Sequence, residues 1–261
     1  MATSMNWQSY LEAIRRESAD LAAAADLGLH PPVPSCPGWT VRNVVGHTGS
    51  VQRQKEQIVR ERWAEAGPDL VVPPDSGLVG WFRQGTELLL ETLAQTDPST
   101  PVYSWYPADQ SAGFWCRRMA HETAIHRVDA ELGHGIVNPV EPVLAADGID
   151  EILTVMMEGY PEWATPTATQ DTLRIECTDQ PGSWSLRFIT WSGTGPESGT
   201  SYLGEPGIVF EDVTRPTAVL RGAASGLDLF MWGRGPREAL ATEGDLALVE
   251  MLRTIAADST G

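Results

Sequence analysis

Clusters of proline and glycine divide the first half of the chain into four long segments, and this division constrains the fold more than any other feature. The breaks are Pro31-Pro32-Val33-Pro34, Pro73-Pro74 and Gly133-His134-Gly135, with a loop over residues 97–110. Proline cannot continue a helix, and glycine often ends one. We therefore expect helices over residues 7–29, 40–66, 77–95 and 111–132. Four long helices with short or moderate connections are typical of a helix bundle.

After Pro139 the pattern becomes mixed. Alternating apolar and polar residues predict strands over residues 172–176 and 183–188, and a further strand is expected over residues 217–220. Helices are expected over residues 143–158, 224–232 and 245–256. The predicted fold class is therefore α+β, with a four-helix bundle over residues 1–138 and a smaller α+β domain over residues 139–261.

Charge and composition exclude several classes of protein. The chain of 261 residues carries 35 Asp and Glu against 18 Lys and Arg, a net charge of −17. Nucleic acids and anionic membrane surfaces both require a basic patch, so neither is an expected partner. No apolar run is long enough to cross a bilayer and the N-terminus lacks the features of a secretory signal, which predicts a cytoplasmic protein. No sequence pattern points to a particular oligomeric state.

The three cysteines, Cys36, Cys116 and Cys177, form no CxxC pair. Their spacing argues against a disulfide scaffold and against a cysteine-based zinc finger. Cys36 precedes Pro37-Gly38 at a helix start, where a thiol can become reactive. No histidine is adjacent to it in the sequence, so we interpret Cys36 as a packed turn residue rather than as a nucleophile.

The fourth expected helix carries a group of ionisable residues. At about 100° per residue, Glu122 and His126 lie some 40° apart around the helix, and Asp129 lies about 20° from Glu122. His121 lies roughly 140° from His126 and should not join them. Helix periodicity therefore selects one of the two histidines, beside two carboxylates, on a largely apolar face.

His47 lies on the second expected helix, on the face of its predicted buried stripe, and should point into the bundle. A set of His47, Glu122 and His126 would leave one coordination position of zinc or a similar ion open, as catalytic sites do. Simpler interpretations stay open. Arg118 and Glu122 can form an i, i+4 ion pair, and both histidines can be core residues bonded to carbonyl groups.

Two stretches resemble the motifs of a known family. Residues 36–47, Cys-Pro-Gly-Trp-Thr-Val-Arg-Asn-Val-Val-Gly-His, resemble the CPGW(T/S)V…H element of the mycothiol-dependent maleylpyruvate isomerase family, and residues 118–130 look like its second element. Residues 147–151 and 222–234 are similar to the family's passage out of the bundle and to its C-terminal domain. The resemblance implies a DinB-like N-terminal bundle and, as metal ligands, the same His47, Glu122 and His126.

The resemblance also implies a thiol cofactor, mycothiol, whose sulfur would fill the open metal position as a thiolate. In that reaction the thiolate adds to a conjugated double bond, the new single bond rotates, and elimination returns the trans isomer. The dianionic substrate needs a cation, for which Arg234 is the first candidate and Arg221 the second. Asp129 and Arg118 are expected behind the ligands, with Asp129 orienting His126 or Arg118.

Three functions are compatible with these observations. Cis–trans isomerisation of an unsaturated dicarboxylate is favoured. A mycothiol S-transferase that conjugates small electrophiles would keep the same site, and a non-catalytic ligand-binding protein is the alternative from another class. Zinc is the expected ion, although nickel and manganese accept the same ligand types.

Overall fold

The computed structural model describes residues 5–67 and 70–260 of the chain. Residue contacts divide these into two compact units, one of Met5–Asn138 and one that begins at Pro139, and each is described by itself. The described residues contain both long helices and a five-stranded sheet. The α+β fold class predicted from the sequence is therefore confirmed.

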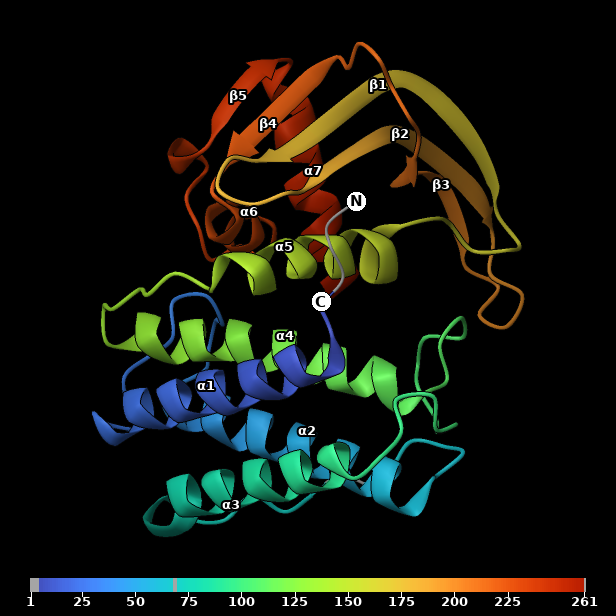
Figure 1. The fold of residues 1–261 in the computed structure, drawn as a ribbon. Coiled ribbons are helices and arrows are strands. Elements are labelled where there is room, and N and C mark those ends of the chain that lie inside the picture. The colour runs from blue at the N-terminus through green and yellow to red at the C-terminus, as the bar shows by residue number, and fades with distance from the viewer. Residues whose placement is uncertain (1–4, 68–69, 261) are drawn as a thin grey trace. The chain divides into compact units, whose positions relative to one another are not determined.

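Four helices make up the described part of the first unit (Figure 1). They are α1 (Trp7–Asp26), α2 (Val41–Glu61), α3 (Asp75–Ala94) and α4 (Ala112–Gly133). Helix α1 packs mainly along α4, and α2 packs mainly along α3. Apolar side chains from all four helices meet in the core, where Leu21, Val44, Phe82 and Ala130 are fully buried.

Polar side chains cap these helices where the sequence breaks. Asn6 accepts a hydrogen bond from the Ser9 amide at 2.9 Å at the start of α1, and Ser111 caps α4 in the same way. The prediction that α2 continues to residue 66 is wrong, because the helix ends at Glu61. Arg62 adopts a left-handed conformation with φ 54°, which turns the chain out of the helix. Because residues other than glycine rarely adopt this conformation, the sequence gives no signal for a helix end at Arg62.

The second unit begins with α5 (Pro142–Glu151), which continues as a π-helix, η1 (Ile152–Met157). The remaining elements are β1 (Thr165–Cys177), β2 (Ser183–Thr194), β3 (Ser201–Phe210), β4 (Ala218–Gly222), α6 (Ala224–Met231), the 3-10 helix η2 (Arg237–Ala239), β5 (Ala241–Gly244) and α7 (Leu246–Thr260). The strand order is β3-β2-β1-β4-β5. Strand β4 runs parallel to β1, and the other neighbours are antiparallel.

Strands β3 and β5 are not predicted by the sequence patterns. Both lie at edges of the sheet, with half of the residues of β3 and three of the four in β5 exposed, so the alternation of apolar and polar residues that marks β1 and β2 is weak in them. Gly204 and Pro206 further weaken the strand pattern of β3.

The sheet of the second unit has one apolar face and one polar face. Leu173, Leu186 and Leu220 are fully buried in the core between the sheet and its helices. Figure 1 shows α5, α6 and α7 on the same side of the curved sheet. Alternate strand residues carry charge, including Arg221 of β4 and Glu176 of β1, which form an ion pair. This arrangement is typical of a sheet with one solvated face.

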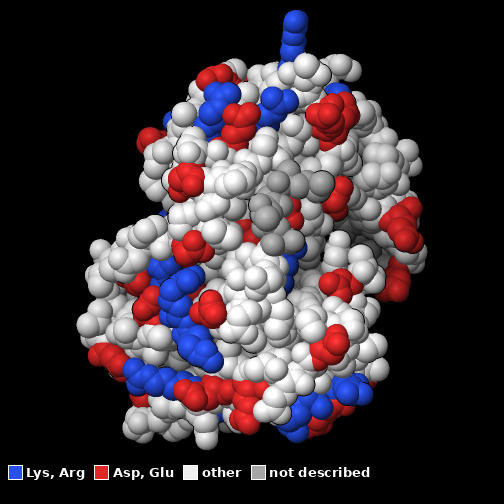
Figure 2. All heavy atoms as spheres, viewed as in Figure 1, with Lys and Arg blue, Asp and Glu red and all other residues white. Residues whose placement is uncertain are grey.

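Within the described residues, no helix is both long enough and apolar enough to span a bilayer. On the face drawn in Figure 2, acidic and basic side chains are interspersed over the surface of this chain of net charge −17.

Candidate metal centre

Helix α4 presents three ionisable side chains on one face. Its regular geometry carries Glu122, His126 and Asp129 along successive turns. His121 lies elsewhere, since its side chain is buried and its ring meets that of Tyr10 edge-on, with the centroids 6.3 Å apart. The helix periodicity therefore separates the two histidines of α4.

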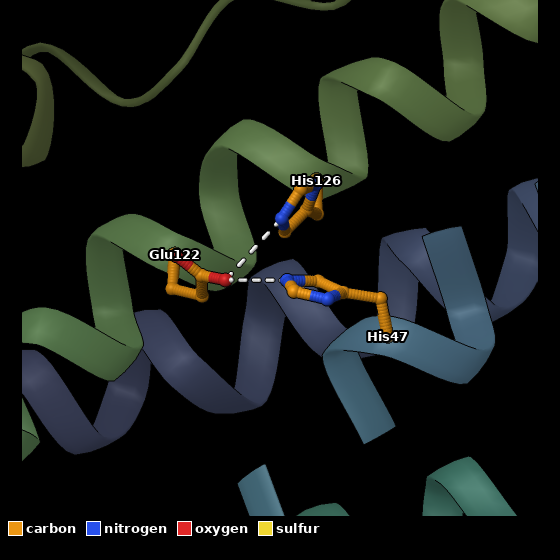
Figure 3. A group of neighbouring side chains, drawn as sticks. All are labelled: His47, Glu122 and His126. Atoms are coloured by element: carbon orange, nitrogen blue, oxygen red, sulfur yellow. Dashed lines mark hydrogen bonds and ion pairs between the residues drawn. The ribbon is translucent and has the colours of Figure 1, made fainter. Parts of the chain in front are cut away.

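Helix α2 brings His47 to the same place. Figure 3 shows its imidazole pointing from α2 toward Glu122 and His126 on α4. His47 Nε2 lies 3.1 Å from Glu122 Oε1, and His126 Nε2 lies 3.2 Å from the same oxygen. One possible donor atom from each residue lies within 4.8 Å of the other two.

The cluster lies at the surface of the bundle. The His47 side chain is 39% exposed, against 20% for Glu122 and 13% for His126, so the expectation that His47 points into the bundle holds only in part. Trp39, from the turn before α2, packs on both imidazoles, with centroid distances of 5.2 Å to His47 and 6.2 Å to His126. The indole covers one side of the two imidazoles. The His47 side chain is partly exposed, so a small solute can reach it.

Asp129 lies behind His126 and is fully buried. Its Oδ2 lies 2.9 Å from His126 Nδ1. The Ser35 hydroxyl donates to Oδ1 at 2.5 Å, and the Cys36 thiol donates to Oδ2 at 3.5 Å. A carboxylate in this position accepts the Nδ1 proton and leaves the Nε2 lone pair facing the other two side chains.

Cations and hydrogen bonds keep Glu122 ionised. Arg118 is buried and donates to Oε2 at 3.2 Å, so the ion pair expected from the sequence coexists with the cluster, which uses Oε1. Burial alone would raise the pKa of Glu122. The charge of His126, hydrogen bonds with His126 and His47, and the charge of Arg118 instead hold that pKa well below its usual range.

Without a metal, the cluster binds a proton tightly. Burial opposes protonation of His126, but the charges of Glu122 and Asp129 and the hydrogen bonds to them raise its pKa to about 9. Because a ligating histidine is neutral, a metal ion has to displace this proton before Nε2 becomes a ligand.

The donor set fits a divalent metal ion. Two imidazole nitrogens and one carboxylate oxygen are usual ligands of catalytic zinc, which keeps a further position open. In both histidines Nε2 faces the shared oxygen, and a carboxylate holds the other nitrogen of His126, as is common for ligated histidines. Trp39, Ser35 and Cys36 support this site, although sequence spacing gives them no role in it.

The two arginines expected to bind the substrate lie in the second unit. Arg221 of β4 forms ion pairs with Glu176, at 2.5 Å, and with Glu243. Arg234 follows α6, is half-buried and donates to the carbonyl of Trp232 at 2.5 Å. The guanidinium of Arg221 is therefore already paired with two carboxylates.

The fold and the site together define the class of this protein. It has a helix bundle with a candidate metal centre of two histidines and one glutamate, and a small α+β unit. Residues 11–131 match the family described as the mycothiol maleylpyruvate isomerase N-terminal domain, and residues 143–251 match the one described as the MDMPI C-terminal domain. The chain belongs to the mycothiol-dependent maleylpyruvate isomerase family, as its sequence motifs predict.

Two solved structures share the fold. One is a crystal structure of the mycothiol-dependent maleylpyruvate isomerase, with a TM-score of 0.57 and 14% identity over 93% of this chain and 95% of that chain. The other is a histidine-to-alanine mutant of the mycothiol-dependent maleylpyruvate isomerase, with a TM-score of 0.59, 15% identity and the same coverage of both chains. No curated protein matches the sequence.

Proposed function

We propose that the chain is a metal-dependent, mycothiol-dependent enzyme acting on a small electrophile, with cis–trans isomerisation of an unsaturated dicarboxylate as the favoured reaction. In this proposal the bundle of residues 1–138 binds the metal, and His47, Glu122 and His126 hold a divalent ion, zinc before other ions. The observation that carries the proposal is the meeting of one donor atom from each residue within 4.8 Å. The matches of both halves of the chain to the domains of one family support it.

The chain's own residues orient the proposed ligands. Asp129 keeps the proton of His126 on Nδ1, and Arg118 holds one oxygen of Glu122, so both α4 ligands are fixed in direction. Trp39 covers one side of the two imidazoles and excludes water there. A bound ion would lower the pKa of a thiol in its open position and so supply a thiolate at neutral pH.

A dicarboxylate substrate also needs a cation to bind it. We assign this role to Arg234 before Arg221, the order that the family resemblance gives; the guanidinium of Arg221 pairs with Glu176 and Glu243. The expected location of the enzyme is the cytoplasm, where small thiols stay reduced.

The first test is the metal content of the purified protein and its variants. We expect wild type and His30→Ala, which removes an exposed histidine, to contain the ion, and His47→Ala, Glu122→Ala and His126→Ala to lose it with the fold intact by circular dichroism. Equal metal content in all five proteins would contradict the proposed centre.

The second test separates the candidate functions. The zinc-loaded wild type is incubated with mycothiol and an unsaturated dicarboxylate or another small electrophile, and the products are identified by mass. A product isomeric with the substrate supports isomerisation, and a persistent thiol adduct supports S-transfer. A protein that binds ligands but gives neither product is the non-catalytic alternative.

A further inference from the structure

The chain contains a single lysine, Lys55, beside 17 arginines. Lys55 lies on α2, eight residues after the proposed ligand His47, and its side chain is half-buried. Apart from this lysine, every Lys or Arg position of the chain is an arginine. The single lysine lies on α2, the helix that carries the proposed ligand His47.

Lys55 reaches the helix that carries the other two proposed ligands. Its Nζ lies 4.4 Å from the centre of the Trp115 ring on α4 and donates to Gln54 Oε1 at 2.5 Å. The Trp115 indole is 1% exposed and donates to the Tyr103 carbonyl at 2.6 Å, which fixes the ring. The ammonium therefore rests on a rigid aromatic face, which attracts its charge.

This aromatic face belongs to the stripe of α4 that carries Glu122. Trp115 precedes Glu122 by seven residues, which corresponds to two helical turns or about 10 Å. The charge of Glu122 acts on the lysine: burial lowers the pKa of Lys55, and Glu122 opposes that shift. Lys55 therefore lies close enough to Glu122 for their charges to interact.

The charges of this site favour an anion once a metal is bound. Among the described residues that touch the proposed ligands, taken together with Lys55, Glu122 and Asp129 supply two negative charges and Arg118 and Lys55 supply two positive ones, so a divalent ion would leave this set positive. In a chain of net charge −17, a positive site attracts anionic ligands selectively. We infer that Lys55 binds a carboxylate of the substrate and so selects carboxylate-bearing electrophiles; this inference rests on the proposed function and narrows its substrate class.

Lysine carries three N–H groups. Within residues 5–67 and 70–260, Gln54 accepts one of them, and the face of Trp115 takes no full hydrogen bond. The remaining donors can reach a carboxylate oxygen without breaking the contact that holds the side chain.

The single lysine allows a direct binding test. Reductive methylation with 13C-labelled formaldehyde labels Lys55 and the N-terminal amine alone and preserves the positive charge of both. We expect maleate, a cis-unsaturated dicarboxylate, to shift the Lys55 methyl signal saturably in the zinc-loaded protein. Its uncharged diamide should leave the signal in place, and the N-terminal signal is the internal reference. A Lys55 signal that stays in place while maleate binds would overturn the inference.

Variants separate substrate binding from a structural role of Lys55. We expect Lys55→Met to weaken maleate binding about 10- to 100-fold. It should raise KM for carboxylate substrates but not for uncharged electrophiles, and Lys55→Arg should recover part of the loss. Arg53→Met is the matched control, because Arg53 lies on the same helix with its guanidinium 4.8 Å from the Trp81 ring on α3. Equal maleate affinity in wild type and Lys55→Met would also overturn the inference.

Failure of the proposed function would look different. The wild type would then bind no zinc, or would show no thiol-dependent turnover with any electrophile. In that case the inference about Lys55 falls together with the proposed function, whereas an unmoved Lys55 signal in a zinc-loaded protein that turns over an electrophile overturns the inference alone.

Discussion

Asp129 Oδ2 lies 2.9 Å from Nδ1 of His126, and the carboxylate is completely buried behind the imidazole. This contact fixes which nitrogen carries the proton and leaves Nε2 to face the other side chains of the cluster. Ser35 and Cys36, from the turn before α2, hold the carboxylate in turn. The orientation of His126 on α4 therefore depends on the turn before α2, the helix that carries His47.

The first prediction concerns this carboxylate. Asp129→Asn keeps the shape of the side chain but removes the charge that stabilises the Nδ1 proton, so we expect zinc affinity to fall about 10- to 100-fold. Competition with a chromophoric chelator measures the affinity. Asp20→Asn, on the exposed face of α1, is the control because it changes the net charge equally. Unchanged affinity in Asp129→Asn would contradict an orienting role.

The arrangement on α4 could be predicted from the sequence because it is local. A fixed rotation per residue places Glu122, His126 and Asp129 on one face of any regular helix. The approach of His47 depends on how α2 packs beside α4, which no spacing within one helix determines. Here the resemblance of residues 36–47 to a family motif supplied the information that periodicity lacks.

The supporting contacts were not predictable in the same way. Ser35 and Cys36 lie 94 and 93 residues from Asp129 in the chain, so their contacts depend on tertiary packing alone. Trp39 likewise packs on two rings from different helices. The helices themselves were predictable because caps and prolines act locally, whereas the exposed edge strands β3 and β5 lack a strong hydrophobic pattern.

The second prediction concerns the stability of the metal-free protein. The pKa of His126 is raised from 6.5 to about 9, so the folded state binds this proton more tightly than the unfolded chain does. The stabilisation is complete below pH 6.5 and is lost as the pH rises through 9. We expect the free energy of unfolding, relative to His126→Gln, to fall by on the order of 3 kcal/mol across this range.

Urea denaturation in the presence of a chelator measures this difference. Excess zinc provides the control, because metal binding displaces the proton and itself becomes tighter as the pH rises. The decline should therefore be absent or reversed with zinc. The same decline with and without zinc would show that His126 is not the group responsible.

The third prediction concerns the cysteines. Burial raises the pKa of Cys116 to about 12, and burial together with the charges of Asp179 and Asp228 raises the pKa of Cys177 to about 11. Because the thiolate is the reactive form, iodoacetamide at about pH 8 should leave both unmodified in the folded protein. Cys116 is buried while Cys36 and Cys177 are partly exposed, so Cys116 should be the last of the three to be modified. Peptide mass spectrometry compares the three sites, and the urea-unfolded chain, in which all three react, is the control.

The fourth prediction concerns a buried ion-pair network that holds the bundle together. The Arg127 guanidinium of α4 lies 2.9 Å from Glu17 of α1 and 2.7 Å from Glu131, and none of the three side chains is more than 7% exposed. Arg127→Met removes the cation that these two buried carboxylates share, although Arg16, which is 43% exposed, still lies 2.9 Å from Glu17. We expect the free energy of unfolding to fall by about 3–5 kcal/mol, measured by urea denaturation.

An exposed ion pair between α1 and α3 supplies the control for this loss. Arg83 and Asp26 lie 2.5 Å apart, with side chains 53% and 52% exposed, so Arg83→Met should cost less than about 1 kcal/mol. Both variants remove one positive charge and break ion pairing, so the difference between them measures the effect of burial. Adding Glu17→Gln to Arg127→Met should restore part of the stability, because it removes one of the two buried carboxylates that have lost Arg127. Equal losses in the two single variants would mean that water reaches the Arg127 network as freely as it reaches the surface pair.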